Sequence, residues 1–399
     1  MLEKIFLITI TLQESSVIVY SGTTLHEINN YLDKHQKALS VLGSISDQTI
    51  AGCLATATHG SGINYKCISS FVKSMDVCVG LPNAPIVHCS KDLNEDLYYA
   101  SLCSLGSTGI ILTVEIEIED AFNLEQKTIG LKFKEDLLRN EKVFLDKWYE
   151  NTFTRAMWIP QINRVQWVTS NKTSKPISKL NESIFEKIFG LLFEPLLLLK
   201  RSIPFISPLL SYIYWIVNFG KETTITDKSY RIFNIDCGLM QYTTEWAIPL
   251  ENGYECLLDL NDWLTREEDV DFPIEIRVAD ADNIWLSPAY SKNDEKFLWI
   301  GLIKYKPYNL NVKYRRMFHI FENILRNYGG KPHWAKHSTV TPEETKQNYE
   351  NFDNFLTTIN KYDPNQLFIN PFVERHLIKP NTNKFVRHFK YNQVSSFGF

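Results

Sequence analysis

Three charged residues in the second half of the chain could do chemistry together: Glu275, Arg277 and Lys336. Glu275 and Arg277 lie in the apolar run 273–278, which predicts a buried strand, and residues two apart on a strand point to the same face. An acid held between two cations suits a site that binds a polar, anion-forming substrate. An exposed cross-strand ion pair would give the same pattern, so both interpretations stay open at this point.

A second candidate for a binding site is the Gly- and Thr-rich stretch 42–62. It opens with Leu-Gly-Ser-Ile at 42–45 and closes with Thr-Ala-Thr-His-Gly-Ser-Gly at 56–62. Glycines let a backbone approach a ligand closely, and N–H and hydroxyl groups can donate to a phosphate or to a ring edge. The stretch lacks the Gly-Lys-Ser/Thr of a P-loop and the spacing of a Rossmann fingerprint. Taken alone, such a stretch is more often a plain loop.

The elements that must position these residues form two parts, and their mixture predicts an α+β fold. The first part, 1–120, has a predicted helix at 24–35, capped by Thr23 or Thr24, and predicted strands at 77–80, 85–88 and 110–118. The second part, 145–399, has predicted strands at 164–169, 243–249, 274–279 and 297–305, and predicted helices at 312–326 and 342–360. At 399 residues the chain is long enough for two or three domains.

The region 184–220 is a hydrophobic insertion in the second part. Its segment Ile203–Gly220 carries no charge and approaches the length of a membrane span, but two prolines and an asparagine weaken that interpretation. Residues that suit a headgroup boundary flank or punctuate it: Lys200, Arg201, Tyr212, Tyr214 and Trp215. We predict a pair of helices lying on a membrane surface. A buried helical hairpin is the alternative.

Composition excludes several classes of function. The formal net charge is -4, so the chain has no overall basic signature for nucleic acid. The seven cysteines include no Cys-x-x-Cys pair and show no metal-ligand spacing. We therefore expect reduced thiols, and we predict no metal site.

Taken together, these segments resemble the sugar-1,4-lactone oxidases, the group of L-gulonolactone oxidase and D-arabinono-1,4-lactone oxidase among the vanillyl-alcohol-oxidase-like flavoproteins. The matching stretches run in family order over nearly the whole chain: 43–45 with 58–62, 105–111, 158–160 with 164–165, 171–173, 233–237, 241–249, 273–277, 286–288, 332–336, 363–364 and 370–371. Each stretch alone is a weak signal, and their order and number make the resemblance specific.

The resemblance implies a PCMH-type FAD-binding domain followed by a substrate domain with a large antiparallel sheet. Family members begin with a Gly-rich half-domain whose His often carries the flavin covalently, and Met1 aligns after that segment. We therefore expect only the second half of the FAD-binding domain here, without the covalent-attachment His. The chain would then be an incomplete gene model or isoform, or a protein that has lost firm flavin binding.

The resemblance also implies roles for individual residues. Arg277 would stabilise negative charge on the reacting oxygen. Glu275 would hold Arg277 in place and accept hydrogen bonds from substrate hydroxyls, and Lys336 would complete this set of polar contacts near the substrate or flavin. Other substrate contacts would come from Ser44, His333 and Trp334, the last two being about as typical of core packing. Residues expected to line FAD are Ser44, Thr49, Gly52, Thr56, Ala57, Thr58, His59 and Ile110. We expect His59 to order its loop, and Glu245 and Trp246 to be structural.

The implied reaction is the oxidation of an aldono-1,4-lactone at C2 with O2, which yields an ascorbate-type enediol lactone and H2O2. The lactone would be D-arabinono- or L-gulono-1,4-lactone, because sequence does not resolve sugar stereochemistry. The resemblance further implies association with an endoplasmic-reticulum or mitochondrial membrane. Two alternatives remain: an inactive, membrane-associated remnant of the family, and an alditol oxidase.

Overall fold

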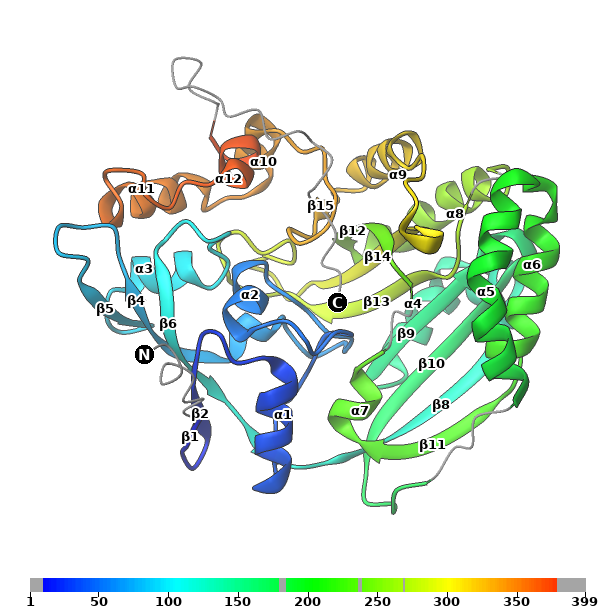
Figure 1. Cartoon of the computed structure of the whole chain (residues 1–399), viewed down its shortest axis with the longest axis horizontal. Coiled ribbons are helices and arrows are strands. Elements are labelled where there is room, and N and C mark those ends of the chain that lie inside the picture. The colour runs from blue at the N-terminus through cyan, green and yellow to red at the C-terminus, as the bar shows by residue number, and fades with distance from the viewer. Residues whose placement is uncertain (1–9, 179–183, 236–238, 268–269, 379–399) are drawn as a thin grey trace.

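The computed structural model describes residues 10–178, 184–235, 239–267 and 270–378, and it contains two antiparallel sheets side by side (Figure 1). The smaller sheet has five strands in the order β1 (Thr11–Leu12), β2 (Ser16–Tyr20), β6 (Ile110–Glu117), β4 (Val72–Cys78) and β5 (Ile86–Ser90). A two-stranded ribbon of β3 (Lys37–Ala38) and β7 (Glu119–Asp120) lies outside it. The strands predicted in this part are confirmed, with ends shifted by a few residues.

Three helices accompany the smaller sheet: α1 (Leu25–Lys34), α2 (Ile50–Ala55) and α3 (Glu95–Ser101). The predicted helix at 24–35 is confirmed as α1, and Thr24 is its N-cap. The Thr24 hydroxyl accepts from Glu27 N at 3.2 Å, while the Glu27 carboxylate accepts from Thr24 N at 2.8 Å. This reciprocal pair satisfies two backbone donors that the helix itself cannot satisfy.

The larger sheet has eight strands, all antiparallel. Their order is β11 (Thr223–Lys228), β8 (Asn123–Lys132), β10 (Arg164–Thr173), β9 (Phe153–Ile159), β13 (Ile274–Asp280), β14 (Lys296–Tyr305), β12 (Gln241–Pro249) and β15 (Lys331–Pro332). The predicted α+β class with a large antiparallel sheet is confirmed. The sheet starts before residue 145, where we predicted the second domain to begin, because β8 pairs with β10 along its whole length.

One face of the large sheet is apolar and covered by helices. Its side chains include Ile276, Ile300 and Trp246, which are all fully buried. The helices over it are α4 (Glu141–Tyr149), α8 (Gly253–Leu264) and α9 (Arg315–Asn327). Arg326 of α9 lies over the Trp246 ring, 4.9 Å from its centroid. Since side chains alternate along a strand, burying this face turns the intervening residues toward the smaller sheet.

The opposite face of the large sheet meets the Gly-rich stretch of the smaller unit. Gly62 N donates to Val278 O at 2.7 Å, and Asp280 N donates to Tyr65 O at 3.0 Å. A Cβ on Gly62 would lie 3.0 Å from both the Phe153 and Tyr65 rings, so the close approach favours glycine. These contacts fix the stretch 42–62 over the polar side chains that β9, β13 and β12 present on this face.

The predicted hydrophobic insertion is a helical hairpin of α5 (Ile184–Ser202) and α6 (Ser207–Tyr214), followed by a short π-helix at Trp215–Phe219. Phe193 and Tyr214 pack on Phe272 and hold the hairpin against the end of the large sheet (Figure 1). No helix in the described part of the chain is both long enough and apolar enough to cross a bilayer.

For three of the five residues predicted to lie at a headgroup boundary, the prediction is wrong, because their side chains pack against the protein. Lys200 is buried, and its Nζ donates to Asp271 Oδ1 at 2.7 Å and to Val270 O at 2.6 Å. The Tyr214 ring packs on Phe272, and the Trp215 ring lies over Gly130 of β8. Arg201 and Tyr212 remain exposed.

The structure has two helices where one was predicted at 342–360: α10 (Pro342–Asn348) and α11 (Phe352–Tyr362). The helix is interrupted at Tyr349, which is buried and has an extended backbone. A third helix, α12 (Pro371–His376), follows. α11 packs on α3, and Lys361 Nζ lies 2.6 Å from Asp96 Oδ2. The end of the predicted second part therefore packs against the smaller sheet.

Candidate active site

Arg277 lies on the polar face of the large sheet between two carboxylates. Its Nη2 donates to Glu245 Oε1 at 2.5 Å, and its Nε lies 3.7 Å from Glu275 Oε2. Strand register explains this arrangement, since Glu275 of β13 and Glu245 of β12 both lie directly opposite Gly301 of β14. A glycine between two glutamates leaves room for the guanidinium. The predicted Glu275–Arg277 pairing on one strand face is therefore what the structure contains.

Glu245 is the site residue whose role the sequence interpretation missed. It is 4% exposed, and burial opposes its ionisation. The charge of the Arg277 guanidinium outweighs burial and holds the pKa of the Glu245 carboxyl well below its usual range. The sequence shows only that Glu245 is a carboxylate within a mostly apolar strand. The strand register that brings it to Arg277 cannot be read from the sequence.

His59 reaches Arg277 from the Gly-rich stretch. Its ring stacks on Trp299 with centroids 3.7 Å apart. Nδ1 donates to Gly60 O at 2.8 Å, so in the neutral ring Nε2 accepts, and Arg277 Nη2 lies 3.4 Å from it. Burial and the charge of Arg277 lower the pKa of His59. A neutral ring that orders the loop agrees with the role we expected for His59.

The set of His59, Glu245 and His333 has the composition of a metal site, with ligand atoms within 4.8 Å of one another. The hydrogen bonds of these residues explain the cluster without a metal ion. The Glu245 carboxylate is already bound to the Arg277 guanidinium, which a metal ion would have to displace. His333 Nδ1 accepts from Ala335 N at 3.1 Å, so the neutral ring carries its proton on Nε2 and presents no lone pair there. Burial holds the pKa of His333 well below its usual range.

The side chains of Lys336 and Trp334 lie in different surroundings. Lys336 follows His333 in a turn, with its N–H donating to His333 O at 2.9 Å, and its positive charge helps to lower the pKa of His333. Trp334 points into the core, where its Nε1 donates to Leu286 O at 2.6 Å and its ring packs on Tyr349. The structure thus places the charge of Lys336 near His333. The predicted substrate contact by Trp334 does not fit this packing.

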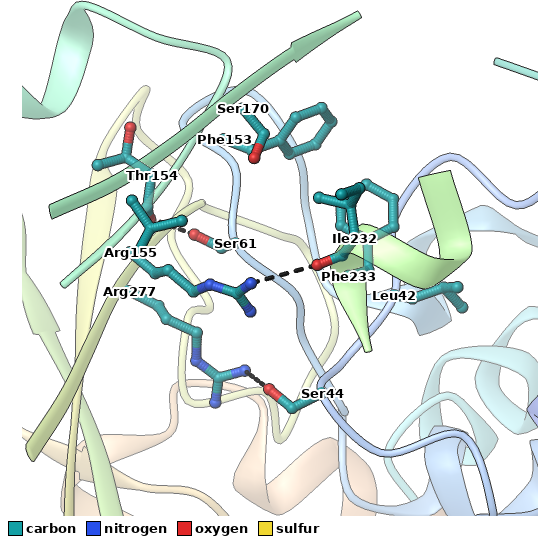
Figure 2. Close-up of a pocket in the computed structure, with 11 residues that line it drawn as sticks. Leu42, Ser44, Ser61, Phe153, Thr154, Arg155, Ser170, Ile232, Phe233 and Arg277 are labelled. Atoms are coloured by element: carbon teal, nitrogen blue, oxygen red, sulfur yellow. Dashed lines mark hydrogen bonds between the residues drawn. The ribbon is translucent and has the colours of Figure 1, made fainter. Parts of the chain in front are cut away.

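A small pocket that is partly open to solvent lies between the Gly-rich stretch and the large sheet (Figure 2). Two guanidinium groups, those of Arg155 and Arg277, point into it from the sheet side. Ser44 faces them, with Oγ 3.4 Å from Arg277 Nη1. The remaining lining residues are Leu42, Ser61, Phe153, Thr154, Val168, Ser170, Ile232 and Phe233. Apolar walls around a few converging donors suit a small polar ring.

The residues predicted to line FAD fall into two groups. Thr49 caps α2, Gly52 and Thr56 lie at solvent-accessible positions along it, and Ile110 at the start of β6 is 55% exposed. The chain links α2 to β6, since Ala51 N donates to Ser21 O and Ser21 N donates to Leu112 O. These residues form an open surface that a planar cofactor could cover. The second group, Ala57, Thr58 and His59, is buried and leads from that surface to Arg277.

The comparisons with known proteins decide the family. A family model described as D-arabinono-1,4-lactone oxidase matches residues 114–376, and an FAD binding domain model matches residues 2–90. The chain belongs to the D-arabinono-1,4-lactone oxidase family. The predicted resemblance is thereby confirmed, and the chain is a flavoprotein oxidoreductase with FAD as its cofactor.

Relatives cover most of this family member. L-gulonolactone oxidase of Bos taurus is 30% identical over 91% of this chain and 81% of its own length. D-arabinono-1,4-lactone oxidase of Debaryomyces hansenii is 29% identical over 80% of this chain and 67% of its own. Cholesterol oxidase from B. sterolicum has the same fold, with a TM-score of 0.75 at 16% identity over 93% of this chain and 83% of that one.

The residues present fit the FAD of this family. The loop 57–62 follows α2 in the chain and brings Ser61 to the pocket, where Ser44 Oγ lies 3.4 Å from Arg277 Nη1. Oε1 of Glu275 is buried and has no hydrogen-bond partner among the described residues. A buried acceptor left open beside a cation is what a hydroxyl-bearing substrate would complete.

Proposed function

We propose that this protein oxidises an aldono-1,4-lactone at C2 and passes the electrons to O2, giving an enediol lactone of the ascorbate type and H2O2. The observation that carries the proposal is the position of Arg277, held between two carboxylates and aimed at a pocket beside the FAD surface. FAD, when bound, supplies the chemistry of accepting a hydride from C2. Everything else required of the site is done by side chains of this chain.

Arg277 and Ser44 stabilise the oxygen on C2 as it gains negative charge. The guanidinium is fixed by Glu245 before substrate binds, so it needs no reorganisation during the reaction. The open Oε1 of Glu275 takes the proton of the C2 hydroxyl, and Lys336 adds positive charge at the edge of the site. The apolar walls Phe153, Ile232 and Phe233 exclude water.

The substrate within this class is D-arabinono-1,4-lactone or L-gulono-1,4-lactone, the two substrates in the names of the relatives. The experiment is peroxide release by purified protein with each lactone and with a polyol. We expect lactone-dependent peroxide and the visible absorbance of bound flavin. Release with the polyol alone would make the protein an alditol oxidase, and colourless protein without turnover would make it an inactive remnant.

We further propose that the α5–α6 hairpin rests on the surface of an endoplasmic-reticulum or mitochondrial membrane. Large apolar side chains stand exposed on it, led by Phe205 at 82%, Leu191 at 81% and Leu209 at 61%. The inner side of the hairpin packs on the large sheet, so the exposed side is not needed for folding contacts. Apolar side chains of this size favour the headgroup boundary of a bilayer.

Flotation with phospholipid vesicles tests this proposal. The triple variant Leu191→Ser, Phe205→Ser, Leu209→Ser should stay with the soluble fraction. A control triple variant, Ile86→Ser, Leu93→Ser, Leu367→Ser, removes three other apolar side chains that are more than half exposed and should still float. Flotation of the hairpin variant with the vesicles would contradict the proposal.

A further inference from the structure

Arg155 stands directly opposite Arg277 in the large sheet. The two residues are register partners on β9 and β13, so their side chains leave the same face and enter the pocket together (Figure 2). Like charges directly opposite one another destabilise an antiparallel pair. A sheet that keeps two arginines at this position therefore has a reason beyond its own stability.

The two arginines differ in their partners. Arg277 has the two carboxylates, whereas Arg155 Nη2 donates only to neutral acceptors, Gln126 Oε1 at 3.1 Å and Ile232 O at 3.2 Å. No ion pair of Arg155 occurs within the described ranges of the chain. The bonds to Gln126 and Ile232 fix the guanidinium without neutralising it. Burial lowers the pKa of Arg155 to about 10, so the group is charged at neutral pH.

The pocket lining matches an anion rather than a cation. Its polar members in the described structure are two guanidiniums and the hydroxyls of Ser44, Ser61, Thr154 and Ser170, and no carboxylate is among them. Neither Glu245 nor Glu275 is among the residues that line the pocket. Glu245 pairs with Arg277 from β12, whereas Glu275, two residues from Arg277 on β13, adds negative charge near Arg155 without contacting it through a hydrogen bond. A guanidinium matches an anion whose charge is shared by two oxygens, because its N–H groups form a fork.

We propose that Arg155 is a second, anion-binding residue of this pocket, and that with Arg277 it holds a planar monoanion whose charge is shared over two oxygens. An enediol lactone is such a species once it loses its acidic proton, and so is the carboxylate of a ring-opened aldonic acid. This inference rests on the proposed function, in which a neutral substrate becomes an acidic product. The pocket would then bind product more tightly than substrate, and Arg155 would be the origin of the difference.

Equilibrium binding to the full-length protein, followed by calorimetry, tests the inference without turnover. The probes are L-ascorbate as the enediolate, D-gluconate as the carboxylate, and a 2-deoxy-1,4-lactone as the neutral ring that lacks the reacting hydroxyl. The wild-type protein should bind ascorbate about tenfold or more tightly than the neutral ring, a difference of about 1.4 kcal/mol. Binding of gluconate as well would extend the site to small carboxylates, and ascorbate alone would restrict it to the enediolate.

Arg155→Gln should remove that preference. The affinity for ascorbate should fall about tenfold, while the affinity for the neutral ring changes by less than about threefold. Arg231→Gln is the matched control, since Arg231 precedes the pocket residue Ile232 but its side chain is 53% exposed and paired with Asp227. It should leave both affinities unchanged. Equal losses for charged and neutral probes in Arg155→Gln would show a structural role and overturn the inference.

The wild-type measurement keeps the inference testable if Arg155→Gln fails to fold. Equal affinity of the wild-type protein for ascorbate and the neutral ring would overturn the inference without any variant. The test is also separate from the proposed function. A protein that binds the anions but releases no peroxide would refute the oxidase activity and leave the anion site in place.

Discussion

Glu245 and Arg277, which are 32 positions apart in the chain, form a buried ion pair of 2.5 Å across the strand that separates them. The pair exists because β14 lies between β12 and β13 and contributes Gly301 at the crossing point. Arg277 is thereby fixed in place before any ligand arrives. This preorganisation is the basis of the proposed catalysis.

Removing the charge of Glu245 should destabilise the fold more than removing that of Glu275. Glu245→Gln leaves the buried Arg277 without its closest carboxylate, and breaking a buried pair costs about 3–5 kcal/mol. The Glu275 side chain is 25% exposed and 3.7 Å from Arg277, so Glu275→Gln should cost about 1 kcal/mol or less. Urea unfolding of both variants measures the difference. Equal losses would mean that Glu245 is not the main anchor of Arg277.

Lys336→Met should slow turnover with little change in stability. Lys336 is half-buried, and its side chain has no ion pair in the described part of the structure, so the fold loses no partner. Its charge acts on the site beside His333. We expect a fall in kcat of about tenfold or more, with an unfolding midpoint close to that of the wild type. Unchanged kcat would remove Lys336 from the catalytic set.

The sequence predicted the strands and helices that carry their own local signals. Alternation placed Glu275 and Arg277 on one strand face, and the Thr24 cap marked the start of α1. Residues whose role depends on pairing between distant strands were missed. The local pattern predicts a structural role for Glu245 and does not mark Arg155, because neither the β12–β14–β13 register nor the pairing of β9 with β13 can be read from neighbouring residues.

Burial by the tertiary structure accounts for the other errors. Lys200 has the sequence setting of a boundary lysine, but Asp271 pairs with it beneath the hairpin. Trp334 stands next to His333, and the turn sends one side chain to the site and the other to the core. The sequence pattern at 342–360 is helical throughout, but the Tyr349 ring packs on Trp334 and the helix is interrupted there.

The Lys200–Asp271 pair should hold the hairpin to the sheet. Lys200→Met removes the nearer of two buried cations beside Asp271, the other being Lys304 at 3.8 Å, whereas the neighbouring Arg201 is exposed. We expect Lys200→Met to lower the free energy of unfolding by about 3 kcal/mol, and Arg201→Met to change it by about 0.5 kcal/mol or less. Chemical denaturation of the two variants tests this. Similar small effects would show that apolar packing alone fixes the hairpin.

Stability should fall as the pH drops below the usual pKa of histidine. Burial lowers the pKa of His376 from 6.5 to about 4, so the folded state resists a proton that the unfolded chain accepts. The stabilising contribution is complete above about pH 6.5 and is lost as the pH falls toward 4. His376→Gln should make the free energy of unfolding less dependent on pH in this window, as measured by urea titrations at several pH values. An unchanged slope would contradict this account of His376.

The central claim, that Arg277 stabilises the charge that develops on the lactone, is tested most directly by the rate of flavin reduction. Wild-type protein and Arg277→Ala would be mixed with lactone in the absence of oxygen, and flavin absorbance would be followed in a single turnover. We predict bound flavin in both proteins and a rate about 10²- to 10³-fold lower in Arg277→Ala. Flavin reduction at the wild-type rate in that variant would contradict the claim.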